Sequence, residues 1–154
     1  MLDNLVIAID LSEDGPRTIA LVGVKEHVLK SRLFSRLFTG LRHFRRVSPD
    51  RRASYLRFFS RRYLKLREMI SLARITHSIN TVENLLHRYE PVVIIIDNKL
   101  NRYISYEPKI LESAPKPKYM DNLVIIADNL ANYFRLLLKD NPRKFREELR
   151  RFEK

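Results

Sequence analysis

The chain has 154 residues, the size of one ordinary globular domain, and a formal charge of +12. It has no cysteine, which excludes disulfides, thiolate metal sites and cysteine nucleophiles. No apolar run reaches the roughly 18 to 20 residues that cross a bilayer, and the N-terminus lacks the basic-then-apolar order of a signal peptide. We therefore expect a cytoplasmic protein with no membrane partner, whose positive charge favours nucleic acid as the partner. Abundant Arg, Lys, Glu and Ile, with no Trp or Gln, is typical of a thermophilic, archaeal-like source.

The first two apolar segments predict a β-hairpin that opens the fold. Residues 4–10 and 17–24 are strand-like, and Gly15 and Pro16 mark a turn between them.

Residues 26–89 are predicted to be mainly helical and strongly basic. From Arg42 to Arg67 there are ten Lys or Arg residues and one acid, a net charge of +9. A long helix is predicted from about Asp50 to about Ala73, because apolar residues recur there every three or four positions. A solvated basic face and a phosphate-binding face are both open interpretations. Six arginines are the candidate phosphate ligands: Arg45, Arg46, Arg52, Arg57, Arg61 and Arg62.

Aromatic residues and histidines give weaker signals. Tyr55 and Phe58 are candidates for stacking on bases, although their helical spacing favours the core. The histidines are dispersed without metal-ligand spacing, so ordinary surface or core positions are favoured for His27, His43, His77 and His87.

The second half of the chain is predicted to alternate between helix and strand. We expect a helix at residues 80–89, a strand covered on both faces at 92–96, and a short strand at 103–105. A Pro-rich connector at 112–119 follows, and residues 139–154 predict a charged, exposed C-terminal helix.

The pentapeptide "DNLVI" occurs at residues 3–7 and again at 121–125. The second copy begins a segment, 121–138, whose apolar residues gather on one side of a helical wheel and whose Asp121 and Asp128 lie on the other. The first copy remains a strand, because a Gly-Pro turn follows it. Identical pentapeptides thus predict different structures.

Several apolar stretches end on an aspartate, which suggests a metal site. If the first strand and residues 92–96 are parallel neighbours, Asp10 and Asp97 emerge at the same edge of the sheet. The helix face that carries Asp121 and Asp128 is then able to join them. Close carboxylates repel one another unless divalent cations such as Mg²⁺ or Mn²⁺ balance them, and two such ions suit phosphodiester cleavage. Taken singly, each aspartate is more often a strand end or a helix cap.

The order of elements resembles the RNase H-like (retroviral-integrase) superfamily. "IDLSEDG" at 9–15 is similar to the "DESG" that opens an uncharacterised RNase H-like family, and "IIADNLANYFR" at 125–135 is similar to its closing "ADxxA" helix. The resemblance implies that Asp10, Asp97 and Asp128 bind Mg²⁺ or Mn²⁺. Asp121 resembles the additional C-terminal acid of RuvC-type resolvases.

The chain also departs from this pattern. The second acid of the opening motif is displaced to Glu13 or Asp14, and no third hairpin strand is evident before the helical section. RNase H enzymes place a glutamate on a helix between the strands, for which Glu68 and Glu83 are candidates.

These features together predict a single α/β domain over residues 1–154. Its RNase H-like mixed sheet would open with a hairpin, carry an arginine-rich helical insertion and be followed by an acid-bearing C-terminal helix. The expected function is a divalent-metal-dependent nuclease acting on DNA or RNA by a two-metal carboxylate mechanism. One alternative is a non-catalytic nucleic-acid-binding protein on the same fold. Another is a PIN-like nuclease, in which the first strand would lead directly into a helix; the predicted turn at Gly15 and Pro16 argues against it.

Overall fold

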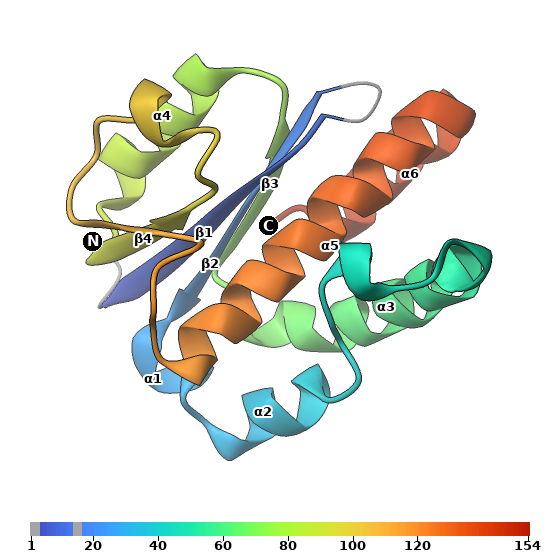
Figure 1. Ribbon diagram of the computed structural model, residues 1–154, viewed down its shortest axis with the longest axis horizontal. Coiled ribbons are helices and arrows are strands. Elements are labelled where there is room, and N and C mark those ends of the chain that lie inside the picture. The colour runs from blue at the N-terminus through green and yellow to red at the C-terminus, as the bar shows by residue number, and fades with distance from the viewer. Residues whose placement is uncertain (1–3, 14–16) are drawn as a thin grey trace.

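The computed structural model describes residues 4–13 and 17–154. Its centre is a five-stranded sheet with the strand order β3-β2-β1-β4-β5 (Figure 1). The strands are β1 (Leu5–Ser12), β2 (Thr18–Lys25), β3 (Leu72–Thr76), β4 (Val93–Ile96) and β5 (Lys109–Leu111). β2 is antiparallel to β1 and β3, whereas β4 is parallel to β1 and β5, so the predicted mixed α/β sheet is confirmed.

The opening hairpin forms where it was predicted. β1 and β2 pair along their whole length, from Leu5 opposite Lys25 to Ser12 opposite Thr18. Almost every side chain in the pair is buried, because helices or loops cover both faces of the sheet. The strand after β1 is thus antiparallel to it, which excludes a PIN-like arrangement.

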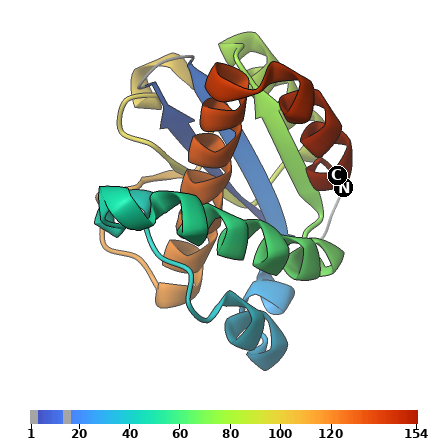
Figure 2. The ribbon, with the colours of Figure 1, turned by 90° about the vertical axis from the view of Figure 1, so that its right-hand side faces the viewer.

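Helices cover the sheet unequally. They are α1 (Glu26–Leu29), α2 (Arg32–Phe38), α3 (Arg52–Leu66), α4 (Ile79–Tyr89), α5 (Lys118–Asp140) and α6 (Pro142–Phe152). Short 3₁₀ turns lie at Phe44–Arg46, Pro49–Arg51, Arg67–Met69 and Asn101–Tyr103. α5 packs on β1 and β2, and Figure 2 shows α3 crossing over α5. α4 lies on the opposite face of the sheet (Figure 1).

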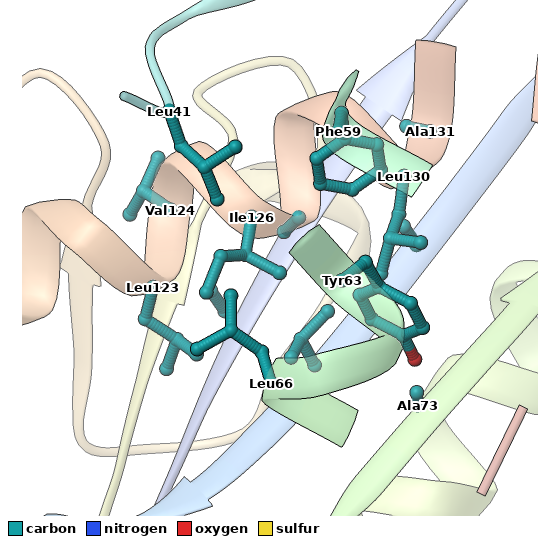
Figure 3. Close-up of a cluster of buried hydrophobic side chains, with 14 of the residues drawn as sticks. Leu41, Phe59, Tyr63, Leu66, Ala73, Leu123, Val124, Ile126, Leu130 and Ala131 are labelled. Carbon is teal, nitrogen blue, oxygen red and sulfur yellow. The ribbon is translucent and has the colours of Figure 1, made fainter. Parts of the chain in front are cut away.

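Strand periodicity divides the core into two halves. Side chains such as Val6, Ala8 and Val22 point towards α3 and α5, where they meet Phe59, Leu130 and their neighbours (Figure 3). The alternate residues of β1 and β2 point towards α4 and pack with its buried apolar side chains. The sheet is therefore the middle of three layers.

The two copies of "DNLVI" adopt different structures, as predicted. Leu5–Ile7 belong to β1, while the copy at 121–125 lies in the first half of α5. Leu123, Ile126 and Leu130 are buried against the sheet and α3 (Figure 3). The helical prediction for 121–138 is confirmed, since its periodicity extends over the whole amphipathic segment.

Two predictions of secondary structure were wrong. The long helix, predicted to run to about Ala73, ends at Leu66, and Ala73 belongs to β3, which follows the helical section. Residues 70–73 continue the apolar spacing of α3, which hid the change to strand. In the second half, residues 101–103 form a 3₁₀ turn, while the last strand is β5.

The C-terminal segment is helical, as predicted, but its apolar residues are buried. Phe145 and Phe152 of α6 pack into the core, and the Phe152 ring stacks on Tyr63 with ring centroids 4.7 Å apart. After α6, Lys154 exchanges two backbone hydrogen bonds with Ala73 of β3. In the described part of the chain, no helix is long and apolar enough to cross a membrane.

Candidate metal site and nucleic-acid interface

Three carboxylates emerge from neighbouring strands on the face that α5 covers. Asp10 lies two residues after Ala8 in β1, Asp97 two residues after Ile95 at the end of β4, and Glu112 two residues after Ile110 at the end of β5. Ala8, Ile95 and Ile110 all pack in the α5-side core. Because side chains alternate between faces, each acid points to the same side as the apolar residue two positions before it.

The pairing of the strands brings these acids together. Ile9 pairs with Ile96, and Ile96 pairs in turn with Leu111, so the next residues along each strand lie side by side. One carboxylate oxygen from each of Asp10, Asp97 and Glu112 lies within 4.8 Å of the other two. We call these three residues the acidic triad.

Hydrogen bonds fix the orientation of Asp97. One of its carboxylate oxygens accepts from the backbone N–H of Leu11 at 3.3 Å, and the other accepts from that of Lys99 at 2.9 Å. Asp97 and Asp10 are only 8% and 5% exposed. Burial of two acids this close to a third is costly unless a cation balances them.

The electrostatic cost appears in two pKa values. Desolvation raises the pKa of Asp10 well above its ordinary value, and the charges of Asp128, Glu112 and Asp97 raise it further. Desolvation also raises the pKa of Glu112, as do Asp97 and Asp128, while His43 and Arg45 act in the opposite direction. Burial and the neighbouring carboxylates therefore disfavour the ionised forms of Asp10 and Glu112.

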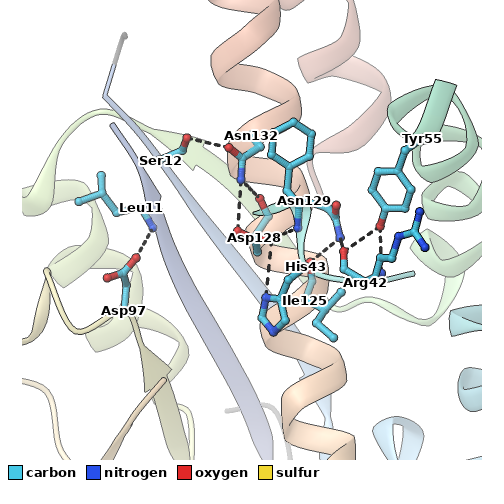
Figure 4. Close-up of polar contacts among 11 residues, drawn as sticks. Leu11, Ser12, Arg42, His43, Tyr55, Asp97, Ile125, Asp128, Asn129 and Asn132 are labelled. Atoms are coloured by element: carbon cyan, nitrogen blue, oxygen red, sulfur yellow. Dashed lines mark hydrogen bonds and ion pairs between the residues drawn. The ribbon is translucent and has the colours of Figure 1, made fainter. Parts of the chain in front are cut away.

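Asp128 borders the triad from α5 and is held by several donors (Figure 4). The backbone N–H of Phe44 donates to one carboxylate oxygen at 2.8 Å, and the Asn132 amide donates to the other at 3.2 Å. The His43 Nδ1 lies 3.8 Å from Asp128 Oδ2. Asn132 in turn accepts from Ser12 Oγ at 3.0 Å, which ties the last residue of β1 to the helix. Asp128 thus faces the same pocket from a rigid position.

The carboxylate of Asp121 lies at the other end of this pocket. The pocket has a volume of about 360 Å³ and contains five acids, Asp10, Asp97, Glu112, Asp121 and Asp128. Asp121 is exposed, and its carboxylate lies 3.5 Å from the Lys116 Nζ. The helix therefore brings both of its predicted acids to the pocket.

Lys116 also holds the segment that carries Glu112. Its side chain is almost fully buried, and its ammonium donates to the carbonyl oxygens of Leu111, Glu112 and Ala114. Since Glu112 comes directly after a strand of only three residues, these hydrogen bonds stabilise the backbone on its C-terminal side.

Sequence reasoning missed two residues of this pocket. Glu112 was placed in a connector, although it follows the apolar pair Ile110–Leu111 just as Asp97 follows an apolar run. That repeated pattern of an acid after a buried run was the available signal. His43 reaches the pocket through the 3₁₀ turn that follows it, and no sequence spacing marks it.

The other acids considered from the sequence lie elsewhere. Glu13 is exposed and pairs with Lys99 at 3.2 Å, and Asp14 is outside the described residues. Glu68 borders a different hollow beside β3, and Glu83 accepts from the backbone N–H of Ser105 at 2.8 Å on the α4 side. Neither Glu68 nor Glu83 lines the acidic pocket.

The predicted arginines are divided among several surfaces. Arg45 lines the rim of the acidic pocket, and Arg52 and Arg57 line a larger groove beside it. Arg46 is exposed, and Arg61 is exposed beyond that groove. The Arg62 guanidinium lies 5.3 Å from the Phe58 ring centre and donates to the Leu37 carbonyl.

The predicted stacking role does not suit Tyr55. It is 7% exposed, and its hydroxyl donates to the Arg42 carbonyl and accepts from the Arg42 N–H. Its hydroxyl therefore joins the segment before α3 to that helix. Phe58 is half-buried beneath Arg62.

The donors in the pocket suit a hard divalent cation. All ligand atoms in the triad are carboxylate oxygens, which Mg²⁺ and Mn²⁺ prefer. Their mutual separation of at most 4.8 Å is close to the span of about 4.2 Å between oxygens on opposite sides of a Mg²⁺ ion. The buried negative charge and the raised pKa values also fit a group that a cation would stabilise.

Comparison with known proteins supports the fold. Neither a protein-family model nor a curated protein matches the sequence. The structure is similar to the crystal structure of ribonuclease H2 from Pyrococcus horikoshii, with a TM-score of 0.54 and 13% sequence identity. The match covers 92% of this chain and 77% of that chain. At this identity the likeness shows the fold alone, and the predicted RNase H-like architecture is confirmed.

Proposed function

We propose that this protein is a divalent-metal-dependent nuclease that hydrolyses phosphodiester bonds. The observation that carries the proposal is the acidic triad, which gathers Asp10, Asp97 and Glu112 from three neighbouring strands. The RNase H-like fold and the net charge of +12 support a nucleic-acid substrate. An uncompensated cluster of buried acids has no evident packing role, since apolar residues of similar size would stabilise the same positions better.

In this proposal the triad would hold one divalent cation, and Asp128, which lines the same pocket, would help to hold a second. When bound, Mg²⁺ or Mn²⁺ supplies Lewis-acid stabilisation of the phosphodiester and activates water. Asp128 keeps its orientation through Phe44 and Asn132, whichever ions are present.

Cations at the rim provide the contacts with the substrate backbone. Arg45 and Lys99 line the acidic pocket beside the acids. Their side chains are long enough to bind the phosphates that flank the scissile bond. Asp121 also lines the pocket and pairs with the buried Lys116.

Cleavage of labelled single-stranded, duplex and hybrid oligonucleotides tests the proposal. The wild-type chain should cleave at least one of them with Mg²⁺ or Mn²⁺ and none with a chelator. Asp97→Asn and Glu112→Gln should each lower the rate at least about 100-fold, because each removes a charged ligand but keeps the shape of the side chain.

Glu107→Gln is the matched control. It removes an exposed acid that precedes β5 and does not line the acidic pocket, and it should leave cleavage within about twofold of wild type. Wild-type rates in Glu112→Gln would contradict the triad, whereas binding of nucleic acid without metal-dependent cleavage would favour the non-catalytic alternative.

A further inference from the structure

A second and larger depression lies beside the acidic pocket. It has a volume of about 780 Å³ and is lined by residues of α3 and of the C-terminal half of α5, two helices whose positions Figure 1 shows. The segment before α3 and the start of α6 complete its walls. We call it the α3/α5/α6 groove; its lining residues include Phe44, Arg52, Leu56, Arg57, Tyr133 and Lys139.

The floor of this groove is apolar and rigid. Phe44, Leu56 and Tyr133 form its buried part, and the Tyr133 ring is fixed by stacking on Phe152, with centroids 5.2 Å apart. The apolar surface that a ligand could cover comes from other lining residues, since Pro49 and Ala53 are exposed and Leu136 is half-buried.

The rim of the groove is cationic. Five Lys or Arg residues line the groove, Arg52, Arg57, Arg135, Lys139 and Lys144, against a single acid, Asp140. Arg135 is buried, whereas Arg57, Lys139 and Lys144 are exposed at the rim. Among the described residues, Arg57, Lys139 and Lys144 form no ion pair with a carboxylate. Three exposed cations around an apolar floor complement a ligand that carries both phosphates and flat apolar rings.

The groove and the acidic pocket share a wall. The Phe44 side chain lines the groove, while its backbone N–H donates to Asp128 in the pocket at 2.8 Å. Arg135 follows Asp128 by seven residues on α5, which is about 10.5 Å along the helix axis. A polynucleotide that crosses the acids is therefore close enough to enter the groove.

We propose that the α3/α5/α6 groove binds an unpaired nucleotide of a single-stranded segment next to the cleavage site. Arg57, Lys139 and Lys144 bind the phosphates, and the apolar floor takes the base. This inference rests on the proposed function, because it assigns the substrate that the acidic pocket would cleave.

An unpaired strand suits the groove better than a duplex does. In a duplex the faces of the bases are stacked on one another, so only the sugar-phosphate backbone would meet the groove and the apolar floor would remain uncovered. A free base presents its ring face and removes apolar surface from water. The groove volume of about 780 Å³ lies in the range of pockets that hold small molecules.

Binding without cleavage tests the inference. The affinity of the full chain, in chelator, is measured by fluorescence anisotropy for a blunt hairpin, the same hairpin with a single-stranded tail, and that hairpin with an abasic tail. DNA and RNA tails are both used. We expect the normal tail to tighten binding about tenfold over the blunt hairpin, and the abasic tail to lose most of this gain, because it keeps the phosphates but lacks bases.

Two triple variants, each of which removes three positive charges, test whether the preference for the tail comes from the groove. The first variant combines Arg57→Ala, Lys139→Ala and Lys144→Ala, and it should lose the preference for the tail. The slope of log binding constant against log salt concentration should become shallower by up to about 2, at about 0.7 per phosphate contact on a single strand. The second variant combines Arg36→Ala, Arg61→Ala and Lys65→Ala, which removes three exposed cations outside the groove. It should keep the preference for the tailed hairpin.

The outcomes separate this inference from the proposed function. Equal binding of normal and abasic tails, or equal loss in both triple variants, would overturn the groove as a base site. If the wild type nevertheless shows metal-dependent cleavage, the proposed nuclease function stands. If the groove binds the tail but no metal-dependent cleavage is seen, the proposed nuclease function is wrong and the groove remains a base site.

Discussion

Asp10 is buried among residues that make its charge unfavourable. Its burial, together with Asp128, Glu112 and Asp97, raises its pKa well above the ordinary 3.8. The folded chain therefore holds this proton more tightly than the unfolded chain does. The resulting stability is present below about pH 3.8 and is lost as the pH rises through the folded pKa. At neutral pH, without metal, Asp10 thus opposes folding.

Asp10→Asn should accordingly stabilise the metal-free protein at neutral pH. We expect a higher Tm than wild type at about pH 7 in chelator and a smaller difference at about pH 4, where the carboxyl is closer to neutral in both chains. Adding Mg²⁺ should reverse the order, because only the wild type gains the bound ion. Scanning calorimetry measures both. A lower Tm for Asp10→Asn in chelator at both pH values would mean that this carboxylate stabilises the fold.

Lys116 offers a test of how Glu112 is positioned. Its ammonium donates to three carbonyl oxygens and pairs with Asp121, so the charge is held inside the 111–116 segment. Lys116→Met keeps the length of the side chain but removes these hydrogen bonds. We expect Mn²⁺ to bind about tenfold more weakly by isothermal titration, as for other residues that orient metal ligands.

The exposed Lys118 supplies the control for this change. Lys118→Met removes the same charge near the same pocket and should change Mn²⁺ affinity by no more than about twofold. Because loss of a positive charge favours cation binding, a charge effect would tighten Mn²⁺ binding in both variants. Mn²⁺ affinity in Lys116→Met equal to that of wild type, or higher, would show that Lys116 does not position Glu112.

At the scale of elements, α5 joins the core to the candidate site. Its one face buries Leu123, Ile126 and Leu130 against the sheet, and its other face presents Asp121 and Asp128 to the pocket. A continuous helical period over the whole segment made this element predictable from the sequence. The same was true of the hairpin, whose two apolar runs flank Gly15 and Pro16 in the sequence; these two residues lie outside the described ones.

β3 and β5 were not predictable for two different reasons. The apolar residues of β3 continue the spacing of α3, and the strand forms because residues 72–76 pair with β2, a contact that is distant in the sequence. β5 has three residues, fewer than a pattern needs, and owes its structure to pairing with β4. Glu112 was missed together with β5, although an acid after the apolar pair Ile110–Leu111 repeats the pattern of Asp97.

Substitutions on the two faces of α5 should differ in their effect on the free energy of unfolding. Leu130 is 1% exposed, so Leu130→Asp buries an unpaired charge and should cost about 4 kcal/mol or more, a large part of an ordinary stability of about 5 to 15 kcal/mol. Asp128→Asn keeps an oxygen for the Phe44 N–H and should leave the fold intact. Urea denaturation followed by circular dichroism measures both. Similar losses from the two variants would mean that Asp128 is needed for folding rather than for the site.

At the scale of the whole molecule, the basic helical section and the acidic pocket belong to one surface arrangement. The section between β2 and β3 folds back over α5, which places Arg45 beside the acids and Arg52 and Arg57 along the groove. The sequence predicted the charge of this section and the sharing of an edge by Asp10 and Asp97. It did not predict which arginines face the site, because that depends on how α3 crosses α5 (Figure 2).

The central claim is that Asp10, Asp97 and Glu112 form a divalent-cation site, and Mn²⁺ shows this most directly. Crystals of the full chain soaked in Mn²⁺ and measured near the manganese absorption edge should give an anomalous peak among these three carboxylates. The peak should vanish in crystals of Asp97→Asn. An anomalous map with no peak at the triad, with the three carboxylates ordered around it, would contradict the account.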